Sequence, residues 1–181
     1  MTKYLCIFII FFNISAYSDN KENIINNLKN TKNFNFDFEQ NINKKIEKGN
    51  CIIEYPKKIY CEYDDTNNKI LVSNGKSLVI KTKVSYYRYP LKKTPLYLLL
   101  DKSFLINKID KLKERIVDNS FINFTIKEND HQINIFFDNI TFNLIGWQTK
   151  DVYQNLNITF ISSVKRNEIF DKNIFKLPIQ N

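Results

Sequence analysis

Glycine and histidine are scarce in this chain, and their scarcity removes several kinds of catalytic site. The 181 residues include three glycines, one histidine and three cysteines, and no two cysteines stand in a Cys-x-x-Cys pattern. Glycine-rich loops that cradle phosphate groups need more glycine than this. A single histidine without paired cysteines cannot supply the ligands of an ordinary zinc site. We therefore expect neither a metal nor a cofactor.

The few candidate catalytic side chains stand in ordinary surface patterns. The only histidine, His131, lies beside a predicted turn among polar residues, which favours a solvated turn residue over a ligand or a base. Two acidic pairs fit the solvent-facing side of a turn and of a strand: Asp64-Asp65 and Asp37/Glu39. The sequence therefore predicts a protein that is not an enzyme, and we expect no nucleic-acid partner.

The chain contains no apolar run long enough to cross a membrane as a helix. Its longest run, residues 5–14, is interrupted only by Asn13 and stops well short of the ~20 residues that a spanning helix needs. Lys3 precedes the run and small residues follow it, so the segment has the three parts of a secretory signal. We therefore predict a signal peptide rather than a membrane anchor.

The expected cleavage point lies before Asp19, because Ala16 and Ser18 then occupy the −3 and −1 positions. A lipoprotein signal would instead place a cysteine at the end of the apolar run, where it becomes the acylated first residue. Cys6 stands near the start of the run. We therefore expect residues 1–18 to be removed and the mature protein to carry no lipid anchor.

The remaining residues, 19–181, have the composition of one domain. They contain no proline- or serine-rich linker, no block of like charge and no repeat, and they are numerous enough to bury a sizeable core. The net charge of the chain is +8. A positive surface favours anionic membranes or acidic partners, although abundant Lys, Asn and Ile are also typical of AT-biased genomes.

The first part of the domain changes from a helical to an extended pattern. In residues 19–32 three apolar side chains stand at helical spacing: Ile24, Ile25 and Leu28. A phenylalanine then occupies every second position: Phe34, Phe36 and Phe38. The first pattern predicts a short amphipathic helix. The second places three rings on one face of a strand.

Strand patterns continue through most of the chain, separated by turn residues. They cover residues 51–55, 58–63, 70–73, 77–82, 84–89, 121–126, 132–137, 140–147, 156–162 and 175–177. Asn74-Gly75 is a strong hairpin signal, because both residues tolerate positive φ. Thr94 and Pro95 predict an N-capped helix over residues 94–100, and residues 104–116 are compatible with another.

So many strands in one domain of this size have to curl, because twisted open sheets seldom stay flat. We therefore predict a mainly β fold with helices, of the α+β class. Its expected architecture is an open antiparallel barrel or half-barrel, with helices packed as plugs against its concave face.

Cys51 and Cys61 are symmetric about Pro56, so a hairpin with an odd-length turn would place them opposite one another on the same face. An oxidising compartment favours a disulfide between them, although cross-strand disulfide geometry is demanding. Two buried thiols remain the alternative.

In their order and spacing, several segments resemble the outer-membrane lipoprotein carrier family, LolA, over essentially the whole mature length. They are Phe34–Gln40, the 49–63 hairpin with Tyr55-Pro56 at its turn, residues 72–78, Tyr89-Pro90-Leu91 with residues 94–99, residues 144–151 with Trp147, and residues 170–178. The resemblance implies an unclosed β-barrel with a helical lid over a hydrophobic cavity.

The resemblance also implies a function. Members of the family are periplasmic and accept acylated lipoproteins from an inner-membrane ABC transporter, the LolCDE complex, and carry them to the receptor LolB in the outer membrane. Such a carrier is needed because each buried acyl methylene contributes ~0.8 kcal/mol, so a bare acylated terminus does not cross water alone. We expect a monomer with these partners.

By this resemblance, one group of residues is expected to line the lipid cavity: Phe34, Phe36, Phe38, Ile53, Ile59, Leu96 and Leu99, with Cys51 and Cys61 on the same face. Ile24 and Leu28 are expected to cover it from the first helix. Family members often carry an arginine before the hairpin proline that holds the lid, and this chain has Tyr55 there. A lid held more weakly is the resulting hypothesis.

Three other kinds of protein were weighed against a carrier. A LolB-like receptor shares the fold but is itself lipid-anchored, and this chain lacks the required cysteine. An outer-membrane β-barrel needs long lipid-facing alternations with aromatic girdles, which the chain lacks. A periplasmic sensor that binds lipoproteins without carrying them is distinguished only weakly by sequence.

Overall fold

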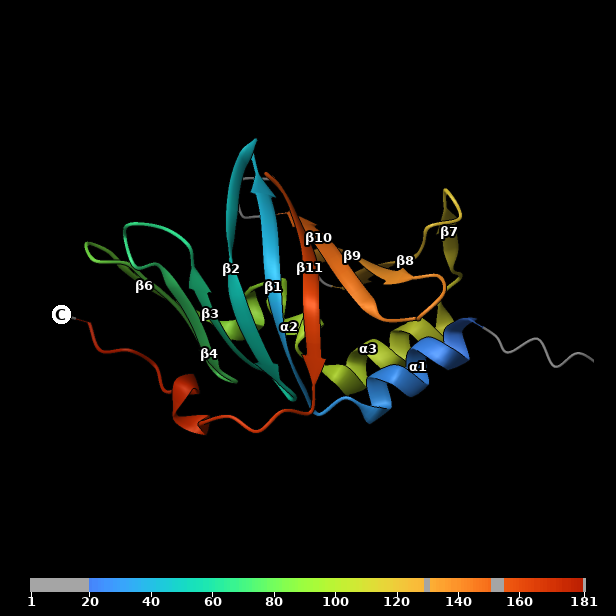
Figure 1. The fold of residues 1–181 in the computed structure, drawn as a ribbon, viewed down its shortest axis with the longest axis horizontal. Helices are drawn as coiled ribbons and strands as arrows, with labels where there is room; N and C mark the ends of the chain where they lie inside the picture. Colours follow the sequence, from blue (N-terminus) through green and yellow to red (C-terminus); the bar gives the residue numbers. More distant parts are fainter. Residues whose placement is uncertain (1–19, 129–130, 151–154, 181) are drawn as a thin grey trace, which may run out of the picture.

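In the computed structural model one long antiparallel sheet curls around a small group of helices (Figure 1). The structure describes residues 20–128, 131–150 and 155–180. The predicted signal peptide and its cleavage point lie outside the described residues. None of the helices in the described part combines the length and apolar character that crossing a bilayer requires.

The sheet has eleven strands in the order β6-β5-β4-β3-β2-β1-β11-β10-β9-β8-β7, so β6 and β7 form its two edges and it does not close into a barrel. This confirms the predicted fold class. The strands are β1 Asn33–Ile42, β2 Lys45–Glu54, β3 Lys58–Tyr63, β4 Ile70–Asn74, β5 Ser77–Lys81, β6 Tyr86–Pro90, β7 Arg115–Val117, β8 Phe121–Glu128, β9 His131–Asp138, β10 Leu144–Lys150 and β11 Leu156–Arg166.

The first strand lies at the centre of this sheet because β1 pairs with β2 on one side and with β11 on the other. Its predicted alternation is present: Phe34, Phe36 and Phe38 are buried, while Asp37 and Glu39 are exposed. The phenylalanines therefore lie on the concave face of the sheet, and the carboxylates lie on the outer face.

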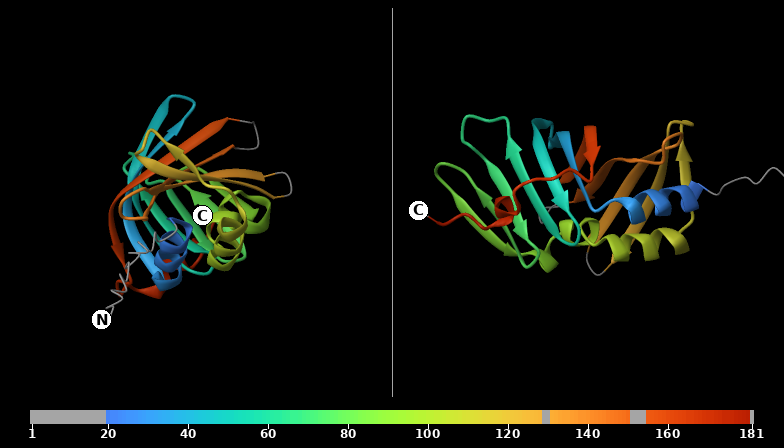
Figure 2. Two further views of the ribbon diagram at one scale, coloured as in Figure 1. Left: turned by 90° about the vertical axis from the view of Figure 1, so that its right-hand side faces the viewer. Right: turned by 60° about the horizontal axis from the view of Figure 1, so that its bottom comes forward.

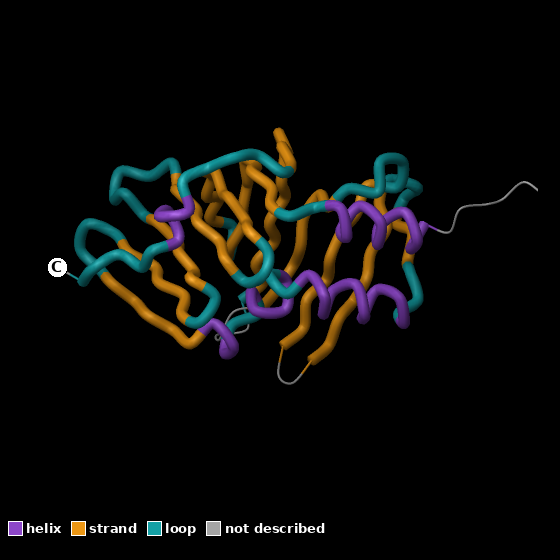
Figure 3. Tube along the Cα trace, turned by 90° about the horizontal axis from the view of Figure 1, so that it is seen from below, coloured by secondary structure: helices purple, strands orange, loops and turns teal. Residues whose placement is uncertain are grey.

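The helices lie within the curve of the sheet, which Figure 2 shows from its end. They are α1 Asn20–Asn30, the 3₁₀ turn η1 Leu91–Lys93, α2 Leu96–Leu99 and α3 Lys102–Lys111; a further 3₁₀ turn, η2 Lys172–Phe175, lies near the C-terminus. Figure 3 shows α1 and α3 side by side across the strands β7 to β10. The other half of the sheet has only η1 and the four-residue α2 on its concave side.

The helix predicted over residues 94–100 is shorter than expected, and Thr94 does not cap it. The Thr94 hydroxyl donates to the Leu91 carbonyl at 2.8 Å instead, and Pro95 occupies the cap position. Asp101 supplies a side-chain cap for the next helix, accepting from the Phe104 N–H at 3.0 Å. The two helices expected in this region are therefore both present, with bounds that differ from the predicted ones.

One predicted strand is absent, and two other predicted elements have different bounds. Residues 175–177 are not a strand: Phe175 ends η2, which packs against β3 and β4. Ile140 belongs to a turn whose N–H groups bond the Asp138 carboxylate, so β10 begins only at Leu144. The segment 104–116 ends in an unexpected strand, β7, at the sheet edge.

Candidate functional site

The concave face of β2 to β5 forms the floor of an apolar cavity of about 230 Å³. Directly opposed residues of antiparallel strands share a face, and the register aligns Cys51 with Cys61, Cys61 with Leu71, and Leu71 with Ile80. The apolar residues that line the cavity from the sheet are Phe38, Ile42, Cys51, Ile59, Cys61, Leu71, Leu78, Ile80 and Trp147. Hairpin pairing therefore carries one apolar stripe across four strands.

Thr94, Pro95 and Leu96 form the roof of this cavity. The roof is tied to the β2–β3 turn by Lys57, whose backbone N–H donates to the Leu100 carbonyl at 2.8 Å. The Lys57 ammonium bonds the Tyr97 hydroxyl at 3.1 Å and the Asp101 carboxylate at 3.1 Å. These partners, Tyr97 first and then Asp101, raise the pKa of Lys57.

The rim of the cavity is polar. Its lining residues include Gln40, Tyr63, Lys69, Thr149, Lys150, Asn157 and Thr159. The Lys69 ammonium lies 3.9 Å from the centre of the Tyr63 ring and 2.6 Å from the Glu47 carboxylate. Burial alone would raise the pKa of Glu47, but hydrogen bonds from Lys45 and Lys69 outweigh it and the pKa is lowered. The apolar floor thus opens to solvent through an ordered charged rim.

Cys51 and Cys61 form a disulfide, with an S–S distance of 2.02 Å, in the wall of the cavity. Both residues are buried. The bond cross-links β2 to β3 at the point where their side chains face the cavity.

The residues expected to line the lipid cavity fall into two groups. Phe38, Ile59 and Leu96 line it together with the two cysteines. Four others are buried in the surrounding core and do not reach the cavity: Phe34, Phe36, Ile53 and Leu99. Ile24 and Leu28 lie on the buried face of α1 and do not line the 230 Å³ cavity either.

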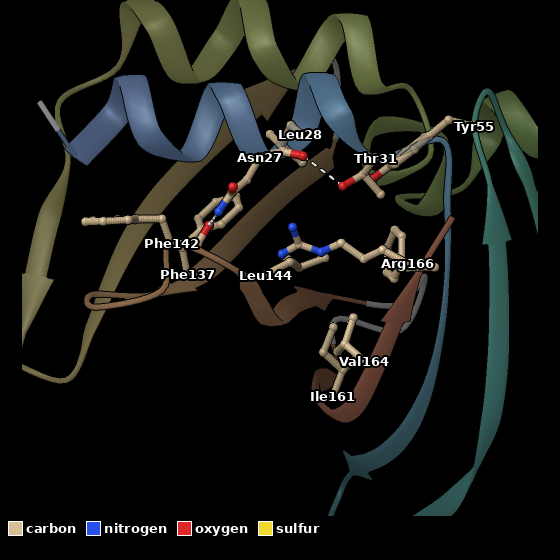
Figure 4. A pocket seen from close by; sticks show the side chains of 11 residues that line it. Asn27, Leu28, Thr31, Tyr55, Phe137, Phe142, Leu144, Ile161, Val164 and Arg166 are labelled. Atoms are coloured by element: carbon tan, nitrogen blue, oxygen red, sulfur yellow. Dashed lines mark hydrogen bonds between the residues drawn. The ribbon is translucent and has the colours of Figure 1, made fainter. Parts of the chain in front are cut away.

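Leu28, Phe34 and Tyr55 instead line a second, much smaller cavity of about 30 Å³, shown in Figure 4. It lies between α1 and the end of β11, and Asn27, Thr31 and Arg166 supply its polar lining. The Tyr55 hydroxyl is buried and bonds no described group, and this burial raises the pKa of Tyr55.

The C-terminal end of α1 is held by cationic and amide side chains rather than by the Tyr55 hydroxyl. Asn27 donates to the carbonyls of Thr141 and Phe142 at 3.0 and 3.2 Å. The Lys102 ammonium donates to the Thr31 carbonyl at 2.9 Å and lies 5.7 Å from the centre of the Tyr55 ring. A cation at this end of a helix interacts favourably with its dipole.

The cavity residues missed from sequence lie on strands far from the hairpin that was recognised. Leu71, Leu78 and Ile80 could be found by extending the register from Cys61 through two further hairpins. Trp147 and Thr159 join the site only through the pairing of β1 with β11 and of β11 with β10, which no local pattern specifies. In the described part of the chain, no group of His, Cys, Asp and Glu could hold a metal ion.

Fold and cavity together define a class of protein: an unclosed antiparallel half-barrel with a disulfide-braced apolar cavity on its concave face and a short helical roof. The family model for the outer membrane lipoprotein carrier protein LolA matches residues 29–178. The chain therefore belongs to the LolA family.

The solved structures that resemble this one have very different sequences. An uncharacterized conserved protein from Thermus thermophilus has a TM-score of 0.51 and 6% identity, covering 88% of this chain and 95% of that one. A LolA superfamily protein from Nitrosomonas europaea has a TM-score of 0.44 and 7% identity, covering 88% and 99%. For the Mycobacterium tuberculosis lipoprotein LppX the values are 0.43 and 8%, covering 83% and 95%. Among curated protein sequences, none matches the chain.

Proposed function

We propose that this protein is a periplasmic carrier that binds the acyl chains of lipoproteins released from the inner membrane and delivers them to an outer-membrane receptor. The observation that carries this proposal is the apolar cavity of about 230 Å³ beneath a roof held largely through Lys57.

The cavity volume bears on how cargo is held. Pockets for small organic ligands have volumes of about 300–1,000 Å³, so this cavity in its present form holds part of one acyl chain. A multiply acylated terminus needs the roof to move outward. The four-residue α2 is suited to such movement, since α1 and α3 brace the other half of the sheet instead.

Delivery depends on a balance of free energies. Each buried acyl methylene contributes ~0.8 kcal/mol, so cargo does not dissociate spontaneously into water. Release then needs an acceptor that binds the chains more favourably. We propose an inner-membrane LolCDE-type ABC transporter as the donor and a LolB-type receptor as the acceptor; family membership and the predicted export signal support both.

A release assay tests this function. Spheroplasts that synthesise labelled lipoproteins are incubated with the purified protein, and the soluble fraction is examined for a lipoprotein complex. We expect release by the wild-type protein. Leu96→Trp fills the cavity from the roof, which costs acyl binding ~1–3 kcal/mol, so release falls on the order of tenfold.

The matched control is Ile140→Trp, because Ile140 is 79% exposed and lies in the β9–β10 turn away from the cavity. It should release lipoproteins as the wild type does. Binding of a fluorescent fatty acid without any release of lipoprotein would contradict a carrier and support a LolB-like receptor or a lipoprotein sensor.

A further inference from the structure

The floor of the cavity continues beyond its roof to the open edge of the sheet. Leu78 and Ile80 of β5 line the cavity, and the register places Tyr89 and Tyr87 of β6 directly opposite them. Because opposed residues share a face, both tyrosine rings extend the concave apolar stripe outward. Their exposed fractions are 54% for Tyr87 and 43% for Tyr89.

This end of the sheet is open. β6 is the last strand, and no described strand pairs with its outer edge; Figure 1 shows it at the opposite end of the molecule from α1 and α3. Within the described part of the chain, neither Tyr87 nor Tyr89 has a hydrogen-bond or ring-contact partner outside the strand ladder.

Basic residues are frequent in the segment that contains the two tyrosines. From Lys76 to Leu100 six residues are basic and none is acidic. Three of them lie near the Pro90 end of β6, because the Leu91 N–H bonds the Lys76 carbonyl at 2.9 Å: Lys76, Lys92 and Lys93. Arg88 alternates with the two tyrosines along β6 and therefore lies on the opposite face, where it bonds the Ser77 hydroxyl. All three lysines are exposed, and none forms an ion pair with a described residue. The neighbouring acid, Asp101, is paired with Lys57.

We propose that this β6 surface, made of Lys76, Tyr87, Tyr89, Lys92 and Lys93, docks on an anionic lipid bilayer. Tyrosine is favoured at membrane interfaces, where its ring is partly in the apolar region and its hydroxyl stays in the headgroup layer. Clustered lysine and arginine residues near such a surface are attracted by anionic headgroups. Docking in this orientation points the open end of the apolar stripe at the bilayer.

A lipid surface fits better than an acidic protein because it satisfies both features at once. Charge alone would attract either partner. The exposed tyrosines, however, continue the apolar stripe that leads into the cavity. Acyl chains that pass along this stripe between the bilayer and the cavity would be shielded from water. The use of this surface in acyl transfer rests on the proposed function, while docking itself does not.

The test is sedimentation of the full protein with vesicles of phosphatidylcholine, with and without phosphatidylglycerol. We expect binding to the anionic vesicles only, weakened by added salt. Lys92→Glu/Lys93→Glu should reduce this binding by about tenfold or more. The matched control, Lys111→Glu/Lys113→Glu, reverses two exposed charges at the far end of α3 and should bind as the wild type does.

Several results would overturn the docking surface: no binding to anionic vesicles, equal binding to neutral ones, or equal loss in both double variants. Binding to polyglutamate as tight as to the vesicles would assign the surface to an acidic protein instead. Tyr87→Ser/Tyr89→Ser should weaken the vesicle binding that remains at high salt. If binding at high salt were unchanged in this variant, the tyrosines would not be part of the docking surface.

A fluorescent fatty acid bound in solution reports separately on the cavity. The Lys92→Glu/Lys93→Glu variant should bind it as the wild type does. Failure of the wild-type protein to bind the fatty acid would count against the proposed function and leave the vesicle result standing. Loss of vesicle binding with fatty-acid binding retained in the variant localises docking to β6.

Discussion

At the scale of single residues, Tyr55 combines a well-packed ring with an unsatisfied hydroxyl. The ring lies 5.9 Å from that of Phe34 and 5.7 Å from the Lys102 ammonium. The hydroxyl is buried and bonds no described group. A buried polar group without a partner costs roughly 1–3 kcal/mol of folding free energy. The hydroxyl oxygen of Tyr55 therefore destabilises the folded protein, whereas the packed ring stabilises it.

Tyr55→Phe should therefore raise the free energy of unfolding by about 1 kcal/mol, because the ring is kept and the unsatisfied oxygen is removed. Urea denaturation measures this difference. Lipoprotein release should stay unchanged, since Lys102 and Asn27 hold the end of α1 without the hydroxyl.

Tyr63→Phe is the matched control, because the Tyr63 hydroxyl is partly buried and donates to the Gln40 side chain at 3.5 Å. Its removal should lower the free energy of unfolding by about 0.5–1.5 kcal/mol. A loss of stability in Tyr55→Phe as large as in the control would show that the Tyr55 hydroxyl has a partner in solution.

At the scale of helices and strands, sequence patterns correctly predicted those elements whose conformation depends on neighbouring residues in the chain. The alternation from Phe34 to Phe38 and the Asn74-Gly75 turn each specify a conformation through neighbouring residues, and both are present; Gly75 has a φ of +94°. The helix predicted over residues 94–100 is present but shorter, because Pro95 rather than Thr94 occupies its cap position and Asp101 caps the helix that follows. Competition between nearby caps is invisible to a pattern that considers one helix at a time.

The Cys51–Cys61 disulfide stabilises the hairpin of β2 and β3. Replacing both residues, Cys51→Ala/Cys61→Ala, should lower the free energy of unfolding by about 2–4 kcal/mol, because the cross-link no longer restricts the unfolded chain and two buried side chains shrink. Chemical denaturation under non-reducing conditions measures the loss.

The wild-type protein in excess reductant is the control for this loss. It should lose part of that stability, whereas the double variant should not respond to reductant at all. Equal midpoints for wild type with and without reductant, together with two titratable thiols in the denatured protein, would contradict the bond.

At the scale of the whole molecule, the two halves of the sheet are covered unequally. Two helices of ten or eleven residues brace the half that contains β7 to β10, and the four-residue α2 roofs the other half. The cavity lies in the half of the sheet that is covered on its concave side only by the short helices η1 and α2. This arrangement was not predictable in detail, because it depends on β1 pairing with β11, whose partners are more than a hundred residues apart in the chain.

Because α2 is the shortest α-helix over the sheet, we expect the roof to be the part that moves. Lys57→Met keeps most of the side-chain volume but removes the contacts to Tyr97 and Asp101 that hold the roof. A fluorescent fatty acid should then leave the protein for acceptor vesicles several-fold faster, since a loss of about 1 kcal/mol from the closed state raises the open fraction about fivefold. Stopped-flow fluorescence measures the transfer rate.

Lys58→Met provides the matched comparison within the same turn, because Lys58 pairs with Glu54 at 3.3 Å and contacts Phe175, away from the cavity. Its transfer rate should equal that of the wild type. Equal acceleration in both variants would mean that transfer depends on general loosening of the β2–β3 hairpin. An unchanged rate in Lys57→Met would mean that chains leave without the roof opening at this tether, and the open stripe towards Tyr87 and Tyr89 would then be the remaining path.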